Sequence, residues 1–267
     1  MSIFRSDLFE DRVGLVSGGG TGIGRGIAEG LAAHGAHTVI LSRKAEHLEP
    51  AAAGISAQTG RRCLAVVADV RSPDQVDEAV ARAMNELGRI DFLVNAAAGN
   101  FLCPAAELSP NGFGTVLDID AKGTWNMSRA VYHAAMSAHG GQILNISATL
   151  HYGGTPQQLH VSAAKAAVDA LTRNLAVEWG PQGIRVNAIA PGPIGDTEGA
   201  RRLFPGEMAE RLRQTVPTRR LGTIADIVNL ALFVLSDAAE NINGAIFVSD
   251  GGLCLKDSFG TLFGAEV

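Results

Sequence analysis

The chain has 267 residues, of which 46% are hydrophobic and 18% charged, and its formal net charge is −5. This apolar fraction is typical of a globular protein with a packed core, and an acidic balance without a basic run argues against nucleic-acid binding. No apolar stretch is long enough and free enough of charge to cross a membrane, so we expect no membrane partner. A single α/β domain can reach ~250 residues, and we expect one domain over residues 1–267.

Short apolar runs alternate with longer helical patterns along the chain. Seven runs predict strands, over Val13–Ser17, His37–Ser42, Cys63–Ala68, Phe92–Asn95, Gln142–Ser147, Ile184–Ile189 and Ala245–Val248. Six segments predict helices, over Ile23–His34, Ala45–Thr59, Pro73–Leu87, Phe113–Ala138, Ser162–Trp179 and Ile224–Leu235. This alternation predicts an α/β fold with a doubly wound parallel sheet of the Rossmann type. Residues 192–223 interrupt it beyond the carboxyl edge of the sheet, and we expect a helical lid there.

Cysteine and histidine spacing indicates neither a disulfide framework nor a metal site. Cys63, Cys103 and Cys254 form no CxxC pair, and the seven histidines show no HExxH spacing. The first residues carry acids where a signal peptide has a basic end and an apolar run. We therefore expect reduced thiols in a cytoplasmic protein that binds no metal.

A glycine-rich turn, Ser17-Gly-Gly-Gly-Thr-Gly-Ile-Gly24, follows the first predicted strand and opens the first helix. Glycines permit a tight turn and a close backbone approach, and the free N–H groups of a helix N-terminus bind pyrophosphate. The strand–turn–helix context therefore predicts a dinucleotide site. Its candidate residues are Gly18, Thr21, Gly22, Ile23 and Gly24.

The end of the second strand indicates which dinucleotide binds. An NAD enzyme usually places an acid there for the ribose 2′-hydroxyl, whereas this chain has Ser42-Arg43-Lys44. Two cations suit a 2′-phosphate, because guanidinium binds phosphate in a forked geometry. We therefore expect Arg43 and Lys44 to select NADP(H).

The spacing of Gly18, Gly22 and Gly24 resembles the TGxxxGxG turn of short-chain dehydrogenases/reductases, with Ser17 in the Thr place. The resemblance continues through nearly the whole chain, at Asp69-Val70, Asn95-Ala-Ala-Ala-Gly99, Pro191-Gly-Pro-Ile194, Arg219-Arg-Leu-Gly-Thr223 and Asp250-Gly-Gly252. It implies cofactor contacts in three places: at the adenine ring from Asp69 and Val70, after the fourth strand from Asn95 and Ala97, and at the nicotinamide from Pro191 and Ile194.

The catalytic signature departs from that family. Its Tyr-xxx-Lys pair is reduced to Lys165, because Val161 occupies the tyrosine place, while the family's serine and asparagine places hold Ala148 and Asp120. The chain has only two tyrosines. Tyr132 lies in a predicted helix and is interpreted as structural. Tyr152 follows the fifth strand and is a candidate proton donor or oxyanion contact.

Loss of this tyrosine removes the family's main acid for protonating an alkoxide. The protein then either binds NADPH without catalysis or reduces something other than C=O. Reduction of a conjugated C=C bond beside a thioester needs an oxyanion stabiliser and a later proton for carbon, and neither requires a tyrosine at position 161.

Five stretches resemble 2,4-dienoyl-CoA reductases of the peroxisomal type: Ala97-Ala-Gly-Asn-Phe101, Asp118-Ile-Asp120, Lys165-Ala-Ala-Val-Asp169, Leu175-Ala-Val-Glu-Trp-Gly-Pro181 and Thr197-Glu-Gly-Ala-Arg-Arg-Leu203. The resemblance implies an acyl-CoA substrate, NADPH-dependent formation of 3-enoyl-CoA in fatty-acid oxidation, a proton added at the α carbon, and a homotetramer. The chain ends Ala265-Glu-Val267 without a peroxisomal address, which agrees with the cytoplasmic expectation.

Candidate roles follow from the resemblance and from helix geometry. Lys165 is expected to bind the nicotinamide ribose and to supply positive charge. Asp169 lies four residues later on the same helix face, so it could pair with Lys165; it is interpreted either as the group that orients a proton-delivering water or as a structural acid. Asp120 is expected to face Lys165 and to hold that water or the lysine.

The substrate side has four candidates. Asn100 and Phe101 are expected to line the acyl slot, although Phe101 fits a plain core residue equally well. Arg202 and Arg219, in the lid segment, are expected to bind CoA phosphates. The alternatives to dienoyl-CoA reduction are another enoyl-CoA reductase, a carbonyl reductase that uses Tyr152, and a non-catalytic NADPH-binding protein.

Overall fold

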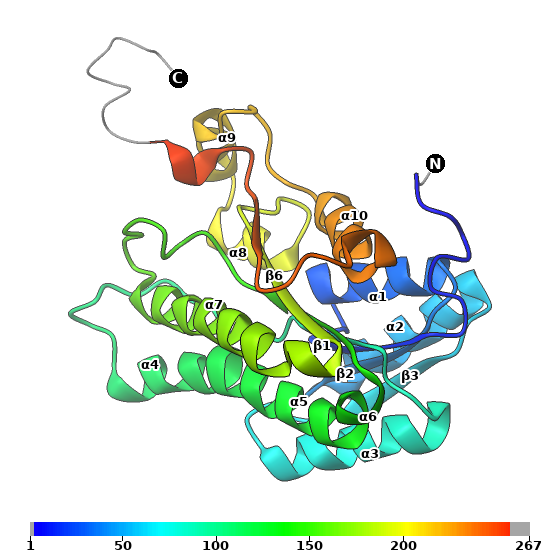
Figure 1. The fold of residues 1–267 in the computed structure, drawn as a ribbon. Coiled ribbons are helices and arrows are strands. Elements are labelled where there is room, and N and C mark those ends of the chain that lie inside the picture. Colours follow the sequence, from blue (N-terminus) through cyan, green and yellow to red (C-terminus); the bar gives the residue numbers. More distant parts are fainter. Residues whose placement is uncertain (1–2, 257–267) are drawn as a thin grey trace.

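The computed structural model describes residues 3–256, and the predicted strands form one parallel sheet (Figure 1). The sheet has the order β3-β2-β1-β4-β5-β6-β7, and every neighbouring pair is parallel. The strands are β1 (Val13–Ser17), β2 (His37–Ser42), β3 (Cys63–Val67), β4 (Phe92–Asn95), β5 (Gly141–Ile146), β6 (Ile184–Pro191) and β7 (Ile246–Ser249). The predicted doubly wound fold is confirmed, with strand ends shifted by at most two residues.

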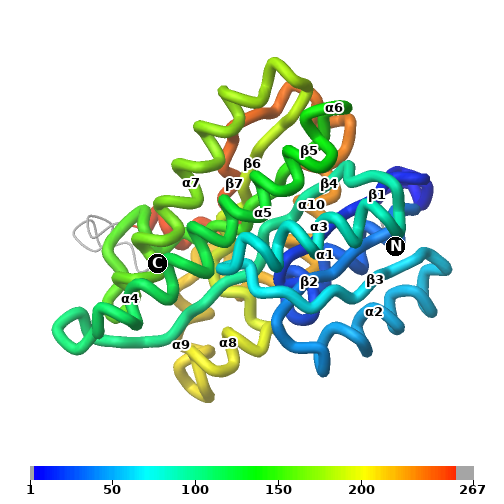
Figure 2. The backbone as a smooth tube through the Cα atoms, turned by 90° about the horizontal axis from the view of Figure 1, so that it is seen from below, coloured from blue at the N-terminus to red at the C-terminus, as the bar shows by residue number. Residues whose placement is uncertain are grey.

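Helices cover both faces of the sheet (Figures 1 and 2). One face carries α1 (Gly22–Ala33), α2 (Ala45–Thr59) and α10 (Ile224–Leu235), whereas the other carries α3 (Pro73–Leu87), α5 (Gly123–Val131) and α7 (Leu159–Trp179). Each layer has its own apolar core, around Ile27 and Leu232 on the first face and around Met127 and Leu175 on the second. Burial on both faces explains why the strands are nearly continuous apolar runs.

The segment predicted as one helix, Phe113–Ala138, is longer and less regular than expected. It begins at Pro110, where Ser109 caps the helix by accepting the Gly112 N–H. Two five-residue π-helical turns interrupt it, so that it runs α4 (Pro110–Leu117), Asp118–Lys122, α5, Tyr132–Met136 and α6 (Ser137–His139). A π turn adds a residue to the helical repeat and is often found at functional sites. Here the first π turn places Asp120 in the interior.

The predicted lid segment contains two short helices, α8 (Glu198–Leu203) and α9 (Glu207–Thr215), neither of which has a buried residue. No helix within residues 3–256 is long and apolar enough to cross a membrane. The chain end Ala265-Glu-Val267, on which the inference about a peroxisomal address rests, lies outside the described residues.

Candidate active site

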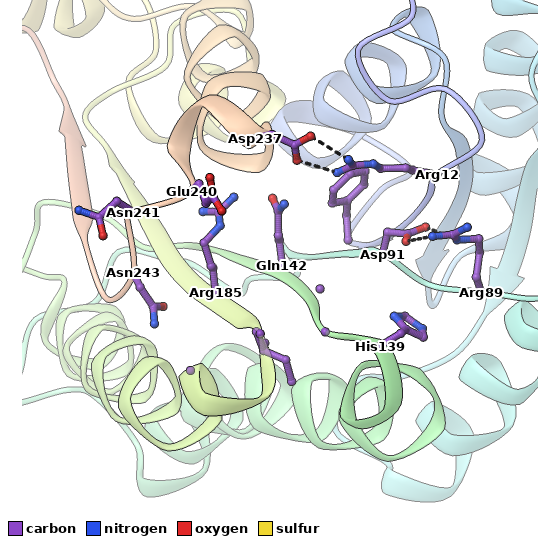
Figure 3. Close-up of a pocket in the computed structure, with 16 residues that line it drawn as sticks. Arg12, Arg89, Asp91, His139, Gln142, Arg185, Asp237, Glu240, Asn241 and Asn243 are labelled. Carbon is purple, nitrogen blue, oxygen red and sulfur yellow. Dashed lines mark hydrogen bonds and ion pairs between the residues drawn. The ribbon is translucent and has the colours of Figure 1, made fainter.

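The sheet has a cavity at each end. The one at the amino ends of β4, β5 and β6 measures about 730 Å³ (Figure 3). Its guanidinium groups have protein partners: Arg12 pairs with Asp237, Arg89 pairs with Asp91, and Arg185 donates to backbone carbonyls. The other cavity, a cleft of about 950 Å³, lies at the carboxyl ends of the strands. Open parallel sheets bind their ligands at this second edge.

The glycine turn forms one wall of the cleft. Gly18 has φ +69°, and a Cβ there would lie 2.7 Å from the carbonyl oxygen of Ala96. Gly22 has φ +55° and leaves open space, because a Cβ would meet only Thr197, at 4.0 Å. Five predicted residues line the cleft, namely Gly18, Thr21, Gly22, Ile23 and Gly24. Because these glycines have no side chains, the backbone N–H groups at the start of α1 are accessible to the pyrophosphate of a dinucleotide.

Cationic and acidic side chains line the end of the cleft where the sequence predicts the adenosine. Arg43 and Lys44 are both exposed there. Lys44 Nζ lies 3.3 Å from Glu46, whereas Arg43 makes no ion pair within residues 3–256. Asp69 lines the cleft beside Val70. A hydrogen bond from Arg71 holds the pKa of the Asp69 carboxyl below its usual value.

Three of the four cofactor candidates at or after the ends of β4 and β6 line the cleft. Ala97, Pro191 and Ile194 line the cleft. Asn95 does not: it is buried, and its Nδ2 donates to Asn145 Oδ1 at 2.9 Å and to Ser128 Oγ at 3.2 Å. Its amide therefore ties β4 to neighbouring elements, and the structure does not place it as a direct cofactor contact.

Lys165 and Asp120 form a buried ion pair beside the cleft. Lys165 Nζ lies 2.9 Å from Asp120 Oδ2 and donates to the carbonyl oxygen of Ile146 at 2.9 Å. Asp120 Oδ1 accepts the Gly99 N–H at 2.7 Å. Their side chains are 9% and 0% exposed, and Lys165 lines the cleft. Because burial weakens screening by water, Asp120 holds the ammonium in place at the cleft wall.

The pairing of Lys165 with Asp169 suggested by helix spacing is wrong, because both carboxylate oxygens of Asp169 have other partners. Ser147 Oγ donates to Asp169 Oδ1 at 2.5 Å, and His151 Nε2 lies 2.8 Å from Asp169 Oδ2. Asp169 is 2% exposed. Ser147 lines the cleft, so it connects this buried acid to the cavity.

Tyr152 lies behind Asp169 rather than in the cleft. Its hydroxyl is 3.5 Å from Asp169 Oδ2, a weak hydrogen bond, and the residue is 42% exposed. Burial of the hydroxyl and the negative charge of Asp169 raise the pKa of Tyr152 to about 12. This tyrosine is therefore a weaker acid than usual, which disfavours the proton-donor role considered from the sequence.

Two of the four substrate candidates reach the cleft. Asn100 and Arg202 line it, and Arg202 Nη2 lies 3.3 Å from the carbonyl oxygen of Asn100. Phe101 does not line it, because its ring stacks on His160 with centroids 4.2 Å apart. Arg219 also lies away from it, since it donates to the carbonyl oxygen of Gln214. The substrate roles predicted for Phe101 and Arg219 are corrected accordingly, and the alternative of Phe101 as a core residue fails too, because the residue is 38% exposed.

Several site residues were not predicted from the sequence. Ser147 and His151 follow β5 and meet Asp169 only in the fold, although their position after a central strand was a signal. Gln158 lines the cleft, and its buried Oε1 has no hydrogen-bond partner among the described residues. Cys254 and Lys256 reach the cleft from beyond β7. No local pattern marks these last two positions.

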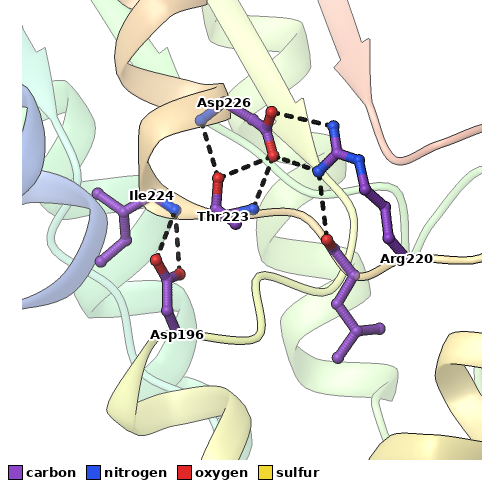
Figure 4. A network of polar contacts seen from close by, with 6 residues as sticks. Asp196, Arg220, Thr223, Ile224 and Asp226 are labelled. Carbon is purple, nitrogen blue, oxygen red and sulfur yellow. Dashed lines mark hydrogen bonds and ion pairs between the residues drawn. The ribbon is translucent and has the colours of Figure 1, made fainter.

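The lid segment is fixed at its base. Ile194 and Gly222 form a bridge where the segment leaves and rejoins the sheet. Asp196 accepts the Ile224 N–H at the start of α10, and Arg220 pairs with Asp226 at 2.6 Å (Figure 4). Residues of α8 line the cleft above this base. A fixed base below two exposed helices suits a segment that closes over a ligand.

Comparison with known proteins agrees with this geometry. A family profile described as "Enoyl-(Acyl carrier protein) reductase" matches residues 18–254. A protein of Pongo abelii named peroxisomal 2,4-dienoyl-CoA reductase, (3E)-enoyl-CoA-producing, is 50% identical over 95% of this chain and 87% of its own. A Bacillus subtilis (strain 168) protein named probable 2,4-dienoyl-CoA reductase, (2E)-enoyl-CoA-producing, is 43% identical over 92% and 98%. A solved short chain dehydrogenase from Bacillus anthracis has a TM-score of 0.88, with 43% identity over 94% and 99%.

Proposed function

This chain belongs to the short-chain dehydrogenase/reductase family, and we propose that it is a 2,4-dienoyl-CoA reductase that forms (3E)-enoyl-CoA with NADPH. One observation of the site carries the proposal. Val161, which is 3% exposed, occupies the place of the family's tyrosine, while Lys165 and Ser147 line the cleft and Ser147 donates to the buried Asp169. This set lacks the acid for a new alkoxide but can supply a proton to carbon.

NADPH, when bound, supplies the hydride that reduces the conjugated diene. The residues at the cleft suit this cofactor, because the glycine turn leaves room for a pyrophosphate and the exposed Arg43 and Lys44 line the same cleft. Arg43 and Lys44 bind the 2′-phosphate, and Lys165 binds the nicotinamide ribose.

The chain's own side chains stabilise the negative charge that develops on the substrate and deliver its proton. Reduction places negative charge on the thioester oxygen and leaves the α carbon to be protonated. The Lys165 ammonium, whose side chain is only 9% exposed, supplies a positive field at the wall of the cleft. Asp169 serves the α carbon through Ser147, the member of the pair that lines the cleft. Arg202 binds a phosphate of the CoA moiety.

The proposal is tested by NADPH consumption with hexa-2,4-dienoyl-CoA in a steady-state assay. We expect turnover, with 3-enoyl-CoA identified by chromatography. A (2E) product would instead match the name of the Bacillus subtilis relative. Turnover of a plain 2-enoyl-CoA alone would reassign the protein as an enoyl-CoA reductase, and tight NADPH binding without any turnover would indicate a non-catalytic protein.

A carbonyl reductase that uses Tyr152 is the competing enzyme hypothesis. It predicts that Tyr152→Phe abolishes ketone turnover, whereas the dienoyl-CoA hypothesis predicts little effect of this substitution on diene turnover. The raised pKa of Tyr152 and its position outside the cleft favour the second outcome.

Assembly and compartment remain predictions. The resemblance implies a homotetramer in which the long helices pack between subunits. The relative from Pongo abelii is named peroxisomal, whereas the cysteine usage led to the cytoplasmic expectation.

A further inference from the structure

A line of buried hydrogen bonds joins two helices through two neighbouring strands. Thr172 Oγ1, on α7, accepts from Asn145 Nδ2 at 2.9 Å, and Asn145 Oδ1, on β5, accepts from Asn95 Nδ2 at 2.9 Å. Asn95, the last residue of β4, also donates to Ser128 Oγ on α5 at 3.2 Å. All four residues are buried, and none of them lines the cleft. We call them the amide ladder: Ser128, Asn95, Asn145 and Thr172.

The two hydroxyl groups at the ends of the amide ladder fix the direction of every bond in it. Thr172 donates its hydroxyl proton to a carbonyl oxygen of α7 at 2.8 Å, and Ser128 donates its own to a carbonyl oxygen of α5 at 2.7 Å. A hydroxyl has one proton, so towards the ladder each of them can only accept. Asn95 therefore donates in both directions, while Asn145 turns its oxygen to Asn95 and its nitrogen to Thr172.

The helices that the amide ladder joins also hold the ion pair beside the cleft. Lys165 lies seven residues before Thr172 on α7, which is about two turns away on the same helix face. On the other side, Ser128 donates to the carbonyl oxygen of Thr124, and Thr124 Oγ1 donates to that of Asp120 at 2.6 Å. The ion pair of Lys165 with Asp120 closes this circuit. The segment from Asp120 to α5 is thus tied to α7 at two points.

The apolar packing around the amide ladder fixes the position of α7 less closely than these bonds do. Met127 and Leu175 fill the same layer, and attraction between such side chains has no preferred direction. Hydrogen bonds depend steeply on distance and angle, and a buried donor without an acceptor is costly. A shift of α7 along its axis would break the bond from Asn145 to Thr172. The amide ladder therefore determines the register of α7 against β5.

We propose that the amide ladder positions Lys165: by fixing the register of α7, it holds the ammonium at the part of the cleft wall where NADPH binds. The inference rests on the proposed binding of the nicotinamide ribose by Lys165, and it adds residues that act on this lysine without contacting the cofactor. Thr172 is the member to change first, because it is the one on α7 and valine keeps its branched shape without the hydroxyl.

Thr172→Val should weaken NADPH binding, because Asn145 loses its acceptor and α7 loses its register. We expect the Kd, measured by titration of NADPH fluorescence, to rise roughly 3- to 30-fold, as for residues that alter binding without contacting the ligand. Thr172→Ser keeps the hydroxyl and should bind within about twofold of wild type. Ser128→Ala, at the other end, should raise the Kd similarly. The double variant should bind about as well as the weaker single variant, because residues that act as one unit are not additive.

The matched control is Thr59→Val, in the last turn of α2 on the opposite face of the sheet. Thr59 Oγ1 donates to the carbonyl oxygen of Ile55 at 2.7 Å, the same type of helical bond that Thr172 makes. Urea unfolding should show that both valine variants are less stable than wild type. Thr59→Val should nevertheless keep the wild-type Kd for NADPH, because it does not bear on Lys165.

A Thr172→Val protein that folds and binds NADPH within about twofold of wild type overturns the inference, and so does a double variant in which the two losses multiply. Lys165→Met tests the premise separately and should weaken binding at least as much as Thr172→Val. Unchanged binding in Lys165→Met would overturn the proposed cofactor role of this lysine, so the two failures are distinguishable.

Discussion

At the scale of single residues, Asp120 shows how one substitution changes a site. The family resemblance places an asparagine here, whereas this chain has an acid whose Oδ2 pairs with Lys165. The same side chain accepts the Gly99 N–H through Oδ1, which an asparagine can also do. The exchange therefore retains the backbone contact and adds a charge opposite the ammonium.

We expect Asp120→Asn to destabilise the fold by about 3 kcal/mol, because it leaves a buried ammonium without its anionic partner. KM for NADPH should also rise, because Lys165 loses the group that holds it. Urea unfolding and steady-state kinetics measure the two effects. The control is Asp118→Asn in the same π turn, where the pair with Lys122 is half exposed and should contribute less than about 1 kcal/mol. Equal losses in both variants would contradict the role given to Asp120.

We propose that Arg43 carries the choice between NADPH and NADH. We expect Arg43→Ala to raise KM for NADPH by roughly 10- to 100-fold, since a hydrogen bond to a charged group contributes about 1.5–3 kcal/mol. KM for NADH, which lacks the 2′-phosphate, should hardly change. Arg62→Ala, at the opposite end of the sheet and paired with Glu86, is the control and should alter neither value. If the variant instead lost affinity for NADPH and NADH equally, Arg43 would bind a part of the cofactor that both molecules have.

At the scale of elements, the sequence predicted the strands well because they are buried on both faces, which leaves continuous apolar runs such as β1 and β2. The glycine turn could also be predicted from the sequence, because its positive φ values and its close backbone contacts require glycine. The π turn at Asp120 was not predictable, because it depends on packing against α7. Asn95, at the end of β4, and Phe101, in the loop that follows, were misplaced because side-chain direction at such positions depends on tertiary partners.

The start of α10 fixes the lid base through a capping box. Thr223 accepts the Asp226 N–H, and the Asp226 carboxylate accepts the Thr223 N–H and pairs with Arg220. The hydrogen bond from Arg220 lowers the pKa of Asp226 to about 2. Because this folded pKa lies below the ordinary value of ~3.9, the stabilisation is complete above about pH 4 and is lost as pH falls through 2.

Asp226→Asn should therefore lower the free energy of unfolding by about 1 kcal/mol at pH 7, the usual contribution of a helix cap. The difference in free energy of unfolding between variant and wild type should fall to about half at pH 3, because protonation of Asp226 destabilises the wild type as well. Urea unfolding at the two pH values measures it. Glu198→Gln, at the start of α8 and outside this network, serves as the control. A difference in free energy of unfolding that does not change with pH would show that the charge of Asp226 does not contribute to stability.

At the scale of the whole molecule, the face formed by α5 and α7 bears apolar side chains. Val177 is 80% exposed, and Trp125 is 39% exposed and stacks beside Trp179. These helices cover the face of the sheet opposite to α1, α2 and α10 (Figure 1). The family resemblance implies a homotetramer, and we expect the face that carries these two side chains to be buried in it.

We expect Val177→Lys to dissociate this assembly, because it would bury an unpaired charge between subunits. Sedimentation equilibrium should show a tetramer for wild type and smaller species for the variant. The control is Val67→Lys, on the edge strand β3 and 56% exposed, which should remain tetrameric. The cleft is lined within one chain by residues from the glycine turn to the lid. NADPH should therefore still bind to the dissociated variant, and a monomeric wild type would contradict the assignment of this face.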